Sequence, residues 1–285
     1  MIVFNGRQIK PHWTKNWGDN IAFELFNALS GKTIEKIHSK KLEKGNIFGL
    51  LEPSQQQGRK NGKLVSIGSV MNYTMPKDFV WGTGCIKQGS IGRKPRKITA
   101  VRGPLTRHEC ESQGWTCPRL YGDPALLMPL VYDLKSAAKY KFGIIPHYIE
   151  FETEFGIKTL ENLERLGFKI LDICSGTINF LEELSECENI FSSSLHGLII
   201  ADAYGVPNAR VNISNQLVGS HFKFIDYCMS VDRQVDWGYQ LTPDTTLSQL
   251  MAIKLNDKIS FDSQSLFDAA PWFLPEFKDV LSIES

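Results

Sequence analysis

His196 is the residue whose type and position most clearly suit chemistry, and it lies in the stretch SSSLHG at residues 192–197. Apolar residues precede this stretch, and an apolar run with helical spacing follows it as far as Ala203. That order predicts a strand, a tight polar turn and a helix that ends near Gly205 and Pro207. His196 would then lie at a helix N-terminus beside the C-terminal end of a strand. Open α/β sheets bind ligands there, and the unpaired N–H groups suit phosphate or carboxylate.

A purely structural interpretation fits the same residues. Ser193 or Ser194 can cap the helix through its hydroxyl, and His196 is then an ordinary histidine of the first turn. In the functional interpretation, Ser193, Ser194 and Gly197 line a ligand site around His196. The pattern alone leaves both alternatives open.

Arg102 is the second candidate, within the stretch VRGPLT at residues 101–106. It lies where a strand is expected to end, and Pro104 suits the first turn of a following helix. A planar guanidinium at such a junction can hold phosphate or carboxylate through two hydrogen bonds. The alternative is a surface ion pair.

Polar and aromatic residues gather at positions 16–20 (NWGDN), just before a helical pattern over residues 21–29. Asp19 or Asn20 would cap that helix, which is the more common role for such residues. A short strand over residues 1–5 would make this region the opening of a βαβ unit.

Short apolar runs rich in Ile, Val and Phe recur through the first half, as buried strands of a parallel sheet do. They cover residues 33–37, 47–51, 64–67, 79–81 and 98–101. The turn Gly82-Thr83-Gly84 directly follows one of them, and glycines after a strand let a ligand approach the backbone. Ordinary turns use the same residues, so the turn alone is weak evidence.

Strand and helix patterns alternate from residue 140 to residue 211, which predicts a second parallel sheet with right-handed crossovers. His147 follows its first strand, where it could contact a ligand or be a loop histidine without a role. Lys223 lies in a helical stretch, where a solvated lysine is the default. The acidic, amphipathic stretch 262–282 predicts a closing helix.

The predicted fold is therefore α/β, with two Rossmann-like domains whose mainly parallel sheets face a cleft. A C-terminal helix is expected to pack back on the first domain. The expected boundaries are residues 1–135, 136–238 and 239–285.

Composition excludes several classes of function. A chain of 285 residues with net charge +1 suits one large or two medium domains and carries no strong field for nucleic acid. We expect neither a secretory signal nor a membrane span, because no apolar run approaches the roughly 20 residues that a bilayer requires. The six cysteines match no zinc-site spacing, so reduced thiols in a cytosol are the simple interpretation.

Four stretches resemble the polysaccharide pyruvyl transferase family, in the family's order. They are residues 16–20 (NWGDN), 101–106 (VRGPLT), 121–125 (YGDPA) and 192–197 (SSSLHG), the last continuing into 201–207. The serine–leucine–histidine–glycine stretch is the most specific of them. The stretch FKF at residues 222–224 is similar to the family's lysine-bearing helix.

The resemblance implies a glycosyltransferase-B-like architecture and a transferase that moves pyruvate from phosphoenolpyruvate onto two hydroxyls of a sugar as a cyclic ketal. The sugar would belong to a capsule, an exopolysaccharide or a precursor. Carried over by position, Arg102, His196 and Lys223 would bind and activate phosphoenolpyruvate, and Asp19 is a candidate base. The other expected ligand contacts are Asn16, Gly18, Asn20, Gly82, Thr83, Gly84, His147, Ser193, Ser194 and Gly197. We expect no metal and no cofactor, since phosphoenolpyruvate is a co-substrate.

Ketal formation needs a proton on the methylene carbon of phosphoenolpyruvate, attack by a sugar hydroxyl, loss of phosphate and closure by a second hydroxyl. A histidine exchanges protons near neutral pH, so His196 would act as a general acid or serve only as a ligand.

Two other functions are kept as alternatives. A sugar-nucleotide-dependent glycosyltransferase could share the two-domain plan, although no G-x-G-x-x-G fingerprint follows the early strands. A non-catalytic polysaccharide assembly protein would not need both Arg102 and His196.

The expected location is the cytoplasm. The basic run RKPRK at residues 93–97 is either a solvated loop or a contact with the inner face of the membrane, if the acceptor is a lipid-linked oligosaccharide. The acceptor sugar, its hydroxyl pair and the oligomeric state stay open.

Overall fold

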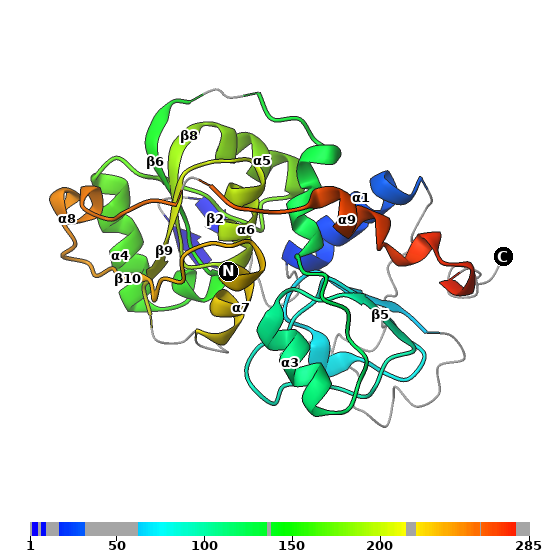
Figure 1. Ribbon diagram of the computed structural model, residues 1–285. Helices are drawn as coiled ribbons and strands as arrows, with labels where there is room; N and C mark the ends of the chain where they lie inside the picture. The colour runs from blue at the N-terminus through cyan, green and yellow to red at the C-terminus, as the bar shows by residue number, and fades with distance from the viewer. Residues whose placement is uncertain are drawn as a thin grey trace.

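A computed structural model describes residues 2–4, 7–9, 17–31, 62–135, 138–214, 221–256 and 258–277. In these residues the chain forms two parallel β-sheets covered by helices, together with a small antiparallel hairpin (Figure 1). The predicted α/β class with parallel sheets is therefore confirmed. The strands expected at residues 33–37 and 47–51 lie outside the described residues.

The first sheet has three parallel strands in sequence order. They are β3 (Leu64–Ser66), β4 (Phe79–Trp81) and β5 (Lys97–Ala100). All three residues of β4 are buried, as expected for a central strand whose apolar side chains face helices or core on both sides. After β5 the chain turns at Gly103 into helix α3 (Pro104–Ser112), with the proline at the first position as predicted.

The second sheet has five parallel strands in the order β10-β9-β8-β6-β7. The strands are β6 (Tyr140–Ile145), β7 (Lys169–Ile170), β8 (Cys187–Ser192), β9 (Asn208–Asn212) and β10 (Tyr239–Gln240). The main helices of this half are α4 (Glu154–Arg165), α5 (Thr177–Ser185), α6 (Leu195–Ala203), α7 (Phe222–Ser230) and α8 (Leu247–Met251). Two 3₁₀ helices, η3 (Pro124–Leu130) and η4 (Tyr148–Phe151), precede and follow β6.

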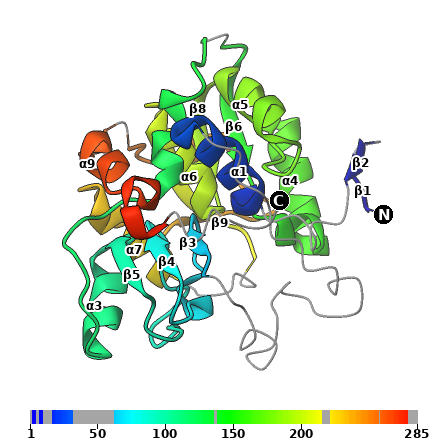
Figure 2. The ribbon, with the colours of Figure 1, turned by 90° about the vertical axis from the view of Figure 1, so that its right-hand side faces the viewer.

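The N-terminal predictions need two corrections. Strand β1 (Ile2–Phe4) pairs antiparallel with β2 (Arg7–Ile9) in a hairpin of its own, so it does not open a βαβ unit (Figure 2). Helix α1 (Trp17–Ser30) already begins at Trp17. Asp19 and Asn20 therefore lie inside its first turn, and the prediction that they cap the helix is wrong.

The largest hydrophobic core lies where α1, η3, α5 and α6 meet, and it takes in residues of both sheets, such as Trp81 of β4 and Ile190 of β8. Ile21 and Leu25 of α1, spaced one helical turn apart, are both fully buried in it. Helix α6 is buried nearly all round, which agrees with its almost wholly apolar sequence. A second core on the other face of the five-stranded sheet contains the stacked rings of Phe142 and Phe168. Among the described residues, no helix combines the length and the apolar character that crossing a bilayer requires.

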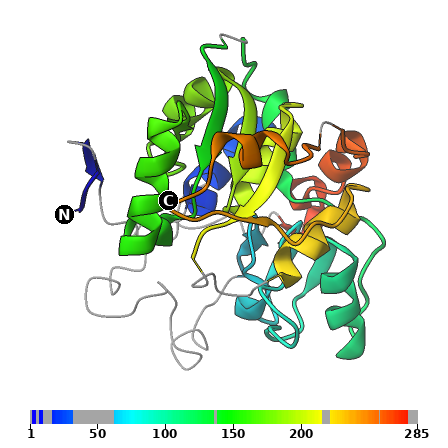
Figure 3. The same cartoon turned by 90° about the vertical axis from the view of Figure 1, so that its left-hand side faces the viewer.

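The C-terminal segment packs back on the first sheet, as predicted. Helix α9 (Ser263–Asp268) contacts β4, where Trp81 Nε1 donates to the carbonyl of Leu266 at 3.0 Å. The rings of Trp81 and Trp272 meet edge to face at 4.9 Å, and those of Phe79 and Phe277 at 5.1 Å. Figure 3 shows this segment on the same side as the three-stranded sheet.

The single long helix expected over residues 262–282 is wrong. The segment is divided instead into α9 and two 3₁₀ turns, η5 (Pro271–Phe273) and η6 (Pro275–Phe277). A proline in a helix interior removes a hydrogen bond and clashes with the preceding turn, so Pro271 and Pro275 start new turns.

The basic run 93–97 is partly engaged with neighbouring residues. Lys97 Nζ lies 2.7 Å from the carboxylate of Glu276 in the C-terminal segment. The Arg96 guanidinium lies over the ring of Phe79. Contact of this run with a membrane stays a prediction.

We expect Trp81→Phe to lower the free energy of unfolding by about 1–3 kcal/mol, because it removes a buried hydrogen bond to the C-terminal segment. Urea unfolding measures this change. Lys97→Ala is the matched control, since it breaks an exposed ion pair worth less than about 1 kcal/mol. Equal stability of Trp81→Phe and the parent protein would contradict a structural role for this contact.

Candidate active site

The predicted strand, turn and helix around His196 are present. Strand β8 ends at Ser192, and α6 begins at Leu195. The Ser192 hydroxyl donates to the carbonyl of Ile145 at 2.8 Å, which ties the turn to the end of β6. A Cβ at position 197 would lie 2.3 Å from that same hydroxyl, so glycine is required for the close approach of helix and turn.

The serines of this turn do not cap α6 through their side chains. Ser194 occupies the N-cap position without a side-chain cap hydrogen bond. Ser193 Oγ instead accepts from the backbone N–H of His147 at 2.9 Å. Side-chain capping of α6 therefore does not explain Ser193 and Ser194.

His196 has a side chain that is 14% exposed, with Nε2 3.9 Å from Asp123 Oδ2. Burial lowers the pKa of His196, the cations Lys223 and Arg102 lower it further, and Asp123 opposes them. The imidazole is therefore neutral at pH 7 when no anion is bound. A neutral histidine with a carboxylate nearby is poised to gain a proton when negative charge arrives.

Asp123 connects this histidine to two other elements. Its Oδ1 accepts from the N–H of Ala125 at 3.0 Å and so caps η3. Its Oδ2 accepts from the N–H of Gly68, in the loop after β3, at 3.1 Å. That loop lies against His196, because a Cβ at Gly68 would be 3.5 Å from His196 Cε1. The position of Asp123 beside the histidine was not predicted from the sequence.

Arg102 follows β5 and is fully buried, so the alternative of a surface ion pair is wrong. Its Nε and Nη2 both lie about 3 Å from Asp226 Oδ2, at 3.0 and 2.9 Å. Nη2 also donates to the carbonyl of Cys85 at 2.7 Å, and Nη1 donates to Ser69 Oγ at 2.5 Å. Four of its five N–H groups are thus committed to the protein.

Asp226 comes from α7, far along the chain, and the sequence analysis did not identify it. Its Oδ1 accepts from the backbone N–H of Thr106 at 2.9 Å, and its Oδ2 accepts from the Thr106 hydroxyl at 2.7 Å. A Cβ at Gly103 would lie 2.0 Å from the Asp226 carbonyl. The ion pair therefore docks α7 closely onto the start of α3.

The turn at residues 82–84 packs beneath this ion pair. A Cβ at Gly84 would lie 2.3 Å from the guanidinium carbon of Arg102, and one at Gly82 would lie 2.3 Å from Pro124. Thr83 is buried, and its hydroxyl donates to the carbonyl of Gly68 at 2.9 Å. These contacts give the turn a packing role, and ligand contact by its residues stays a prediction.

Lys223 is buried on α7, three residues before Asp226, so the default of a solvated lysine is wrong. Burial lowers the pKa of Lys223 to about 8, and the charges of Arg102 and Arg210 contribute. In the part of the chain that the structure describes, no carboxylate forms an ion pair with its ammonium group. A buried cation without a partner is costly, so the position favours a bound anion.

Arg210 is a further buried cation that the sequence analysis missed. It lies in β9 opposite Ser192 of β8, and burial lowers its pKa. Its guanidinium carbon lies 3.8 Å from the centre of the Phe224 ring. The available signal was an arginine between the apolar residues Ala209 and Val211 of a predicted strand.

His147 stands at the end of β6, next to the same turn. Its Nδ1 accepts from the N–H of Ile149 at 3.4 Å, which leaves the proton of the neutral ring on Nε2. Burial lowers its pKa to about 3, with added effects of the charges of Lys223 and His196. His147 therefore lies close enough to Lys223 and His196 for their charges to affect its pKa.

The structure thus groups four of the predicted residues: Arg102, His147, His196 and Lys223. Gly18, Asp19 and Asn20 lie in the first turn of α1, and their side chains lie outside the described part of the structure. Asn16 lies outside the described residues altogether.

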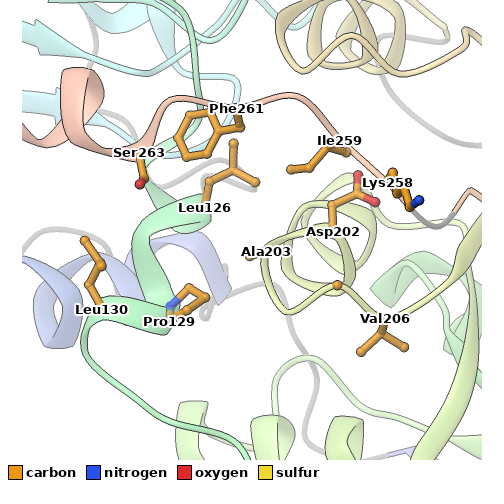
Figure 4. A pocket seen from close by; sticks show the side chains of 11 residues that line it. Leu126, Pro129, Leu130, Asp202, Ala203, Val206, Lys258, Ile259, Phe261 and Ser263 are labelled. Atoms are coloured by element: carbon orange, nitrogen blue, oxygen red, sulfur yellow. The ribbon is translucent and has the colours of Figure 1, made fainter.

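A pocket of about 470 Å³ lies elsewhere, between η3, the end of α6 and residues 258–263 (Figure 4). Its Asp202 is six residues from His196, which is about 9 Å along α6. The Asp202 carboxylate is already bound to Arg233 at 3.0 Å and to the Tyr227 hydroxyl at 2.7 Å. This pocket is lined mainly by apolar side chains. We therefore place the candidate active site around Arg102, His196 and Lys223 instead.

Comparison with known proteins confirms the family resemblance. Residues 93–215 match the model of the polysaccharide pyruvyl transferase family. The matched stretch contains Arg102, His147, His196 and Arg210. Over this stretch, which is less than half of the chain, the protein is therefore similar to the polysaccharide pyruvyl transferase family.

Two relatives give this result a more specific context. The succinoglycan biosynthesis protein ExoV of Rhizobium meliloti (strain 1021) is 27% identical over 195 residues, which are 65% of this chain and 58% of the relative. The uncharacterized protein L143 of Acanthamoeba polyphaga mimivirus is 26% identical over 166 residues, or 56% of this chain and 57% of the relative. The chain thus spans less than two thirds of the length of either relative. No solved structure matches it.

We expect Asp226→Ala to lower the free energy of unfolding by about 3–5 kcal/mol, because it leaves the Arg102 charge buried without a partner. The double variant Arg102→Met/Asp226→Leu should recover most of that loss, since it removes both charges together. Denaturant unfolding measures both variants. Arg107→Ala, which breaks an exposed pair with Glu111, is the control. A double variant no more stable than Asp226→Ala would argue against the pair as the main interaction here.

Proposed function

We propose that this protein transfers pyruvate from phosphoenolpyruvate to two hydroxyls of a sugar as a cyclic ketal, in the biosynthesis of an exopolysaccharide. The observation that carries the proposal is the buried Lys223 without a carboxylate partner, grouped with His196 and His147. An anionic substrate would supply the missing negative charge. The family match and the relation to a succinoglycan biosynthesis protein support the choice of reaction.

The architecture we propose has two Rossmann-like halves that face a cleft, as in glycosyltransferase-B-like enzymes. Residues 1–135 form the acceptor half, residues 136–238 the phosphoenolpyruvate half, and residues 239–285 an extension that returns to the first half. The Arg102–Asp226 contact supports this arrangement, because it joins a strand end of the first sheet to α7. The acceptor is a polymer or a lipid-linked precursor in the cytoplasm.

Phosphoenolpyruvate carries a phosphate and a carboxylate, so its site needs several fixed positive groups. Lys223 would contact one anionic group directly, and the N–H groups at the start of α6 would receive the other. Arg102 would act mainly as a positioning residue, because Asp226, Cys85 and Ser69 take most of its donors. Its charge still adds to the positive potential at the site.

His196 is proposed to protonate the methylene carbon. Binding of the substrate's negative charges raises the pKa of the neutral imidazole, so the ring gains a proton as the substrate binds. Transfer of this proton to the methylene carbon forms the new methyl group and makes the central carbon electrophilic. A sugar hydroxyl then attacks that carbon, and phosphate leaves with the electrons of the C–O bond.

A second hydroxyl closes the ketal ring. The two hydroxyls release two protons in all: one restores the proton that His196 gave, and the other leaves with phosphate or solvent. A base near the acceptor would assist these steps. Asp19 stays a candidate for that base on its position in α1, and the neutral His147 is a second candidate.

We expect phosphate release by the purified protein to require both phosphoenolpyruvate and a polysaccharide or lipid-linked acceptor fraction. His196→Gln should lower turnover by about 10²–10⁴-fold while phosphoenolpyruvate still binds, because the acid is lost and the cations remain. Phosphate release and substrate binding are measured separately. Release of nucleoside diphosphate from sugar nucleotides would instead indicate a glycosyltransferase. Near-normal turnover of His196→Gln would refute its acid role.

The lowered pKa of Lys223 predicts that the affinity for phosphoenolpyruvate depends on pH. Its pKa of about 8 keeps the ammonium charged at lower pH, so affinity should fall as the pH rises through about 8. Lys223→Met should weaken binding by about 10–100-fold and remove this alkaline decline. Calorimetric titration across this range measures the effect, with Lys139→Met as the control at an exposed lysine. Parallel pH profiles for Lys223→Met and the parent protein would count against the assignment.

A further inference from the structure

Arg210 carries a buried charge that the proposed donor site does not use. Its side chain is 3% exposed, and its Nε has no hydrogen-bond partner among the described residues. Its hydrogen-bond partners are neutral: the Asp236 carbonyl at 3.2 Å, Asn212 Oδ1 at 3.4 Å and His221 Nδ1 at 2.9 Å. The Asp236 carboxylate acts on Arg210 through its charge, which opposes the lowering of the Arg210 pKa by burial, but forms no ion pair with it among the described residues. A buried guanidinium held by neutral groups and left with an unused donor is a site for an anion.

The charges of Arg210 and Arg102 affect the pKa values of different, overlapping sets of residues. The pKa of Lys223 responds to both arginines, whereas the pKa of His196 responds to Arg102 and Lys223 but not to Arg210. Arg210 also lies near Lys223 in the fold, because its guanidinium carbon is 3.8 Å from the ring centre of Phe224, the residue that follows Lys223.

Trp237 is an exposed aromatic residue fixed beside Arg210. Its side chain is 61% exposed, and its ring meets the ring of His221 edge to face at 4.8 Å. His221 is the residue whose Nδ1 contacts Arg210. The Arg210 guanidinium, the imidazole and the indole thus form a continuous path from the buried charge to the surface.

Asn212, the last residue of β9, holds this arrangement in place. Its Nδ2 donates to the carbonyls of Trp237 at 2.8 Å and Gly238 at 3.1 Å, while its Oδ1 faces Arg210. Gly238 has a φ of +80°, and a Cβ there would lie 2.8 Å from the Asn212 amide nitrogen. The loop that carries Trp237 is therefore built tightly onto the strand end that carries Arg210.

We propose that Trp237, His221 and Arg210 form an acceptor subsite that binds a sugar ring bearing an anionic group. The exposed indole offers an apolar face to the ring, and an aromatic side chain with a polar edge suits such amphipathic ligands. Arg210 pairs with the anionic group, which is either a phosphate or a carboxylate. This inference rests on the proposed function in that the sugar is the pyruvate acceptor, and it extends the acceptor contacts beyond residues 1–135 onto the edge of the phosphoenolpyruvate half, residues 136–238.

The test is binding of small probes, which does not require turnover. Saturation-transfer NMR with galactose 1-phosphate and glucuronic acid should show contact with sugar protons for at least one of them. Methyl galactoside, which lacks the charge, and inorganic phosphate, which lacks the ring, should bind more weakly. Galactose 1-phosphate alone would assign a phosphate, and glucuronic acid alone would assign a carboxylate.

Trp237→Ala should weaken binding of the charged sugar by about tenfold, the loss expected for one aromatic contact. Phe273→Ala removes another exposed aromatic residue, at 54% exposure in the C-terminal segment, and should bind like the parent protein. Arg210→Gln should abolish the preference for charged over neutral sugar. Because Trp237 is exposed, its variant tests the subsite even if Arg210→Gln fails to fold.

Equal binding of methyl galactoside and the charged sugars, or unchanged binding by Trp237→Ala, would overturn the subsite. So would failure of both charged sugars to bind. Titration with phosphoenolpyruvate separates this failure from failure of the proposed function, because it reports on the donor site independently. Retained phosphoenolpyruvate binding in Trp237→Ala supports two distinct subsites, and its loss contradicts them.

Discussion

The buried ion pair between Arg102 and Asp226 sets the positions of the charges in this site. It joins the strand end of the first sheet to α7, a helix more than 100 residues later in the chain, and Thr106 completes the carboxylate's hydrogen bonds. Lys223 lies one turn before Asp226 on α7. Because the pair fixes that helix, it also fixes where the ammonium group of Lys223 lies. A buried pair of this kind specifies geometry more than it adds stability.

The Arg102–Asp226 pair neutralises one buried cation of the site and leaves others without a carboxylate partner. Asp226 compensates the Arg102 charge, whereas no carboxylate in the described part of the chain pairs with Lys223 or Arg210. The same burial and positive charge keep His196 and His147 neutral. The side chains of the site therefore carry excess positive charge, while His147 and His196 are unprotonated. A multiply charged anion would neutralise the positive charge and raise the pKa of His196. Binding of such a substrate would therefore be coupled to protonation of His196.

The sequence was sufficient for the parts of the site that depend on local order. The apolar run, the serine turn and the helix around His196 are encoded within about twenty consecutive residues, and Arg102 was placed correctly at a strand end. Burial of Lys223 and the roles of Asp226 and Arg210 depend on contacts between distant segments, which periodicity does not reveal. The N-terminal hairpin was missed because a short strand looks the same in an antiparallel hairpin and in a βαβ unit. The division of the C-terminal helix could have been foreseen from Pro271 and Pro275.

In the proposed function, bound phosphoenolpyruvate neutralises the excess positive charge of the site, and its negative charge makes His196 take up a proton from solvent. Calorimetric titration of phosphoenolpyruvate in two buffers of different ionisation enthalpy, at the same neutral pH, tests it most directly. We expect stoichiometric binding with net uptake of protons, and a smaller uptake for His196→Gln. Absence of binding, or binding without proton uptake, would contradict it.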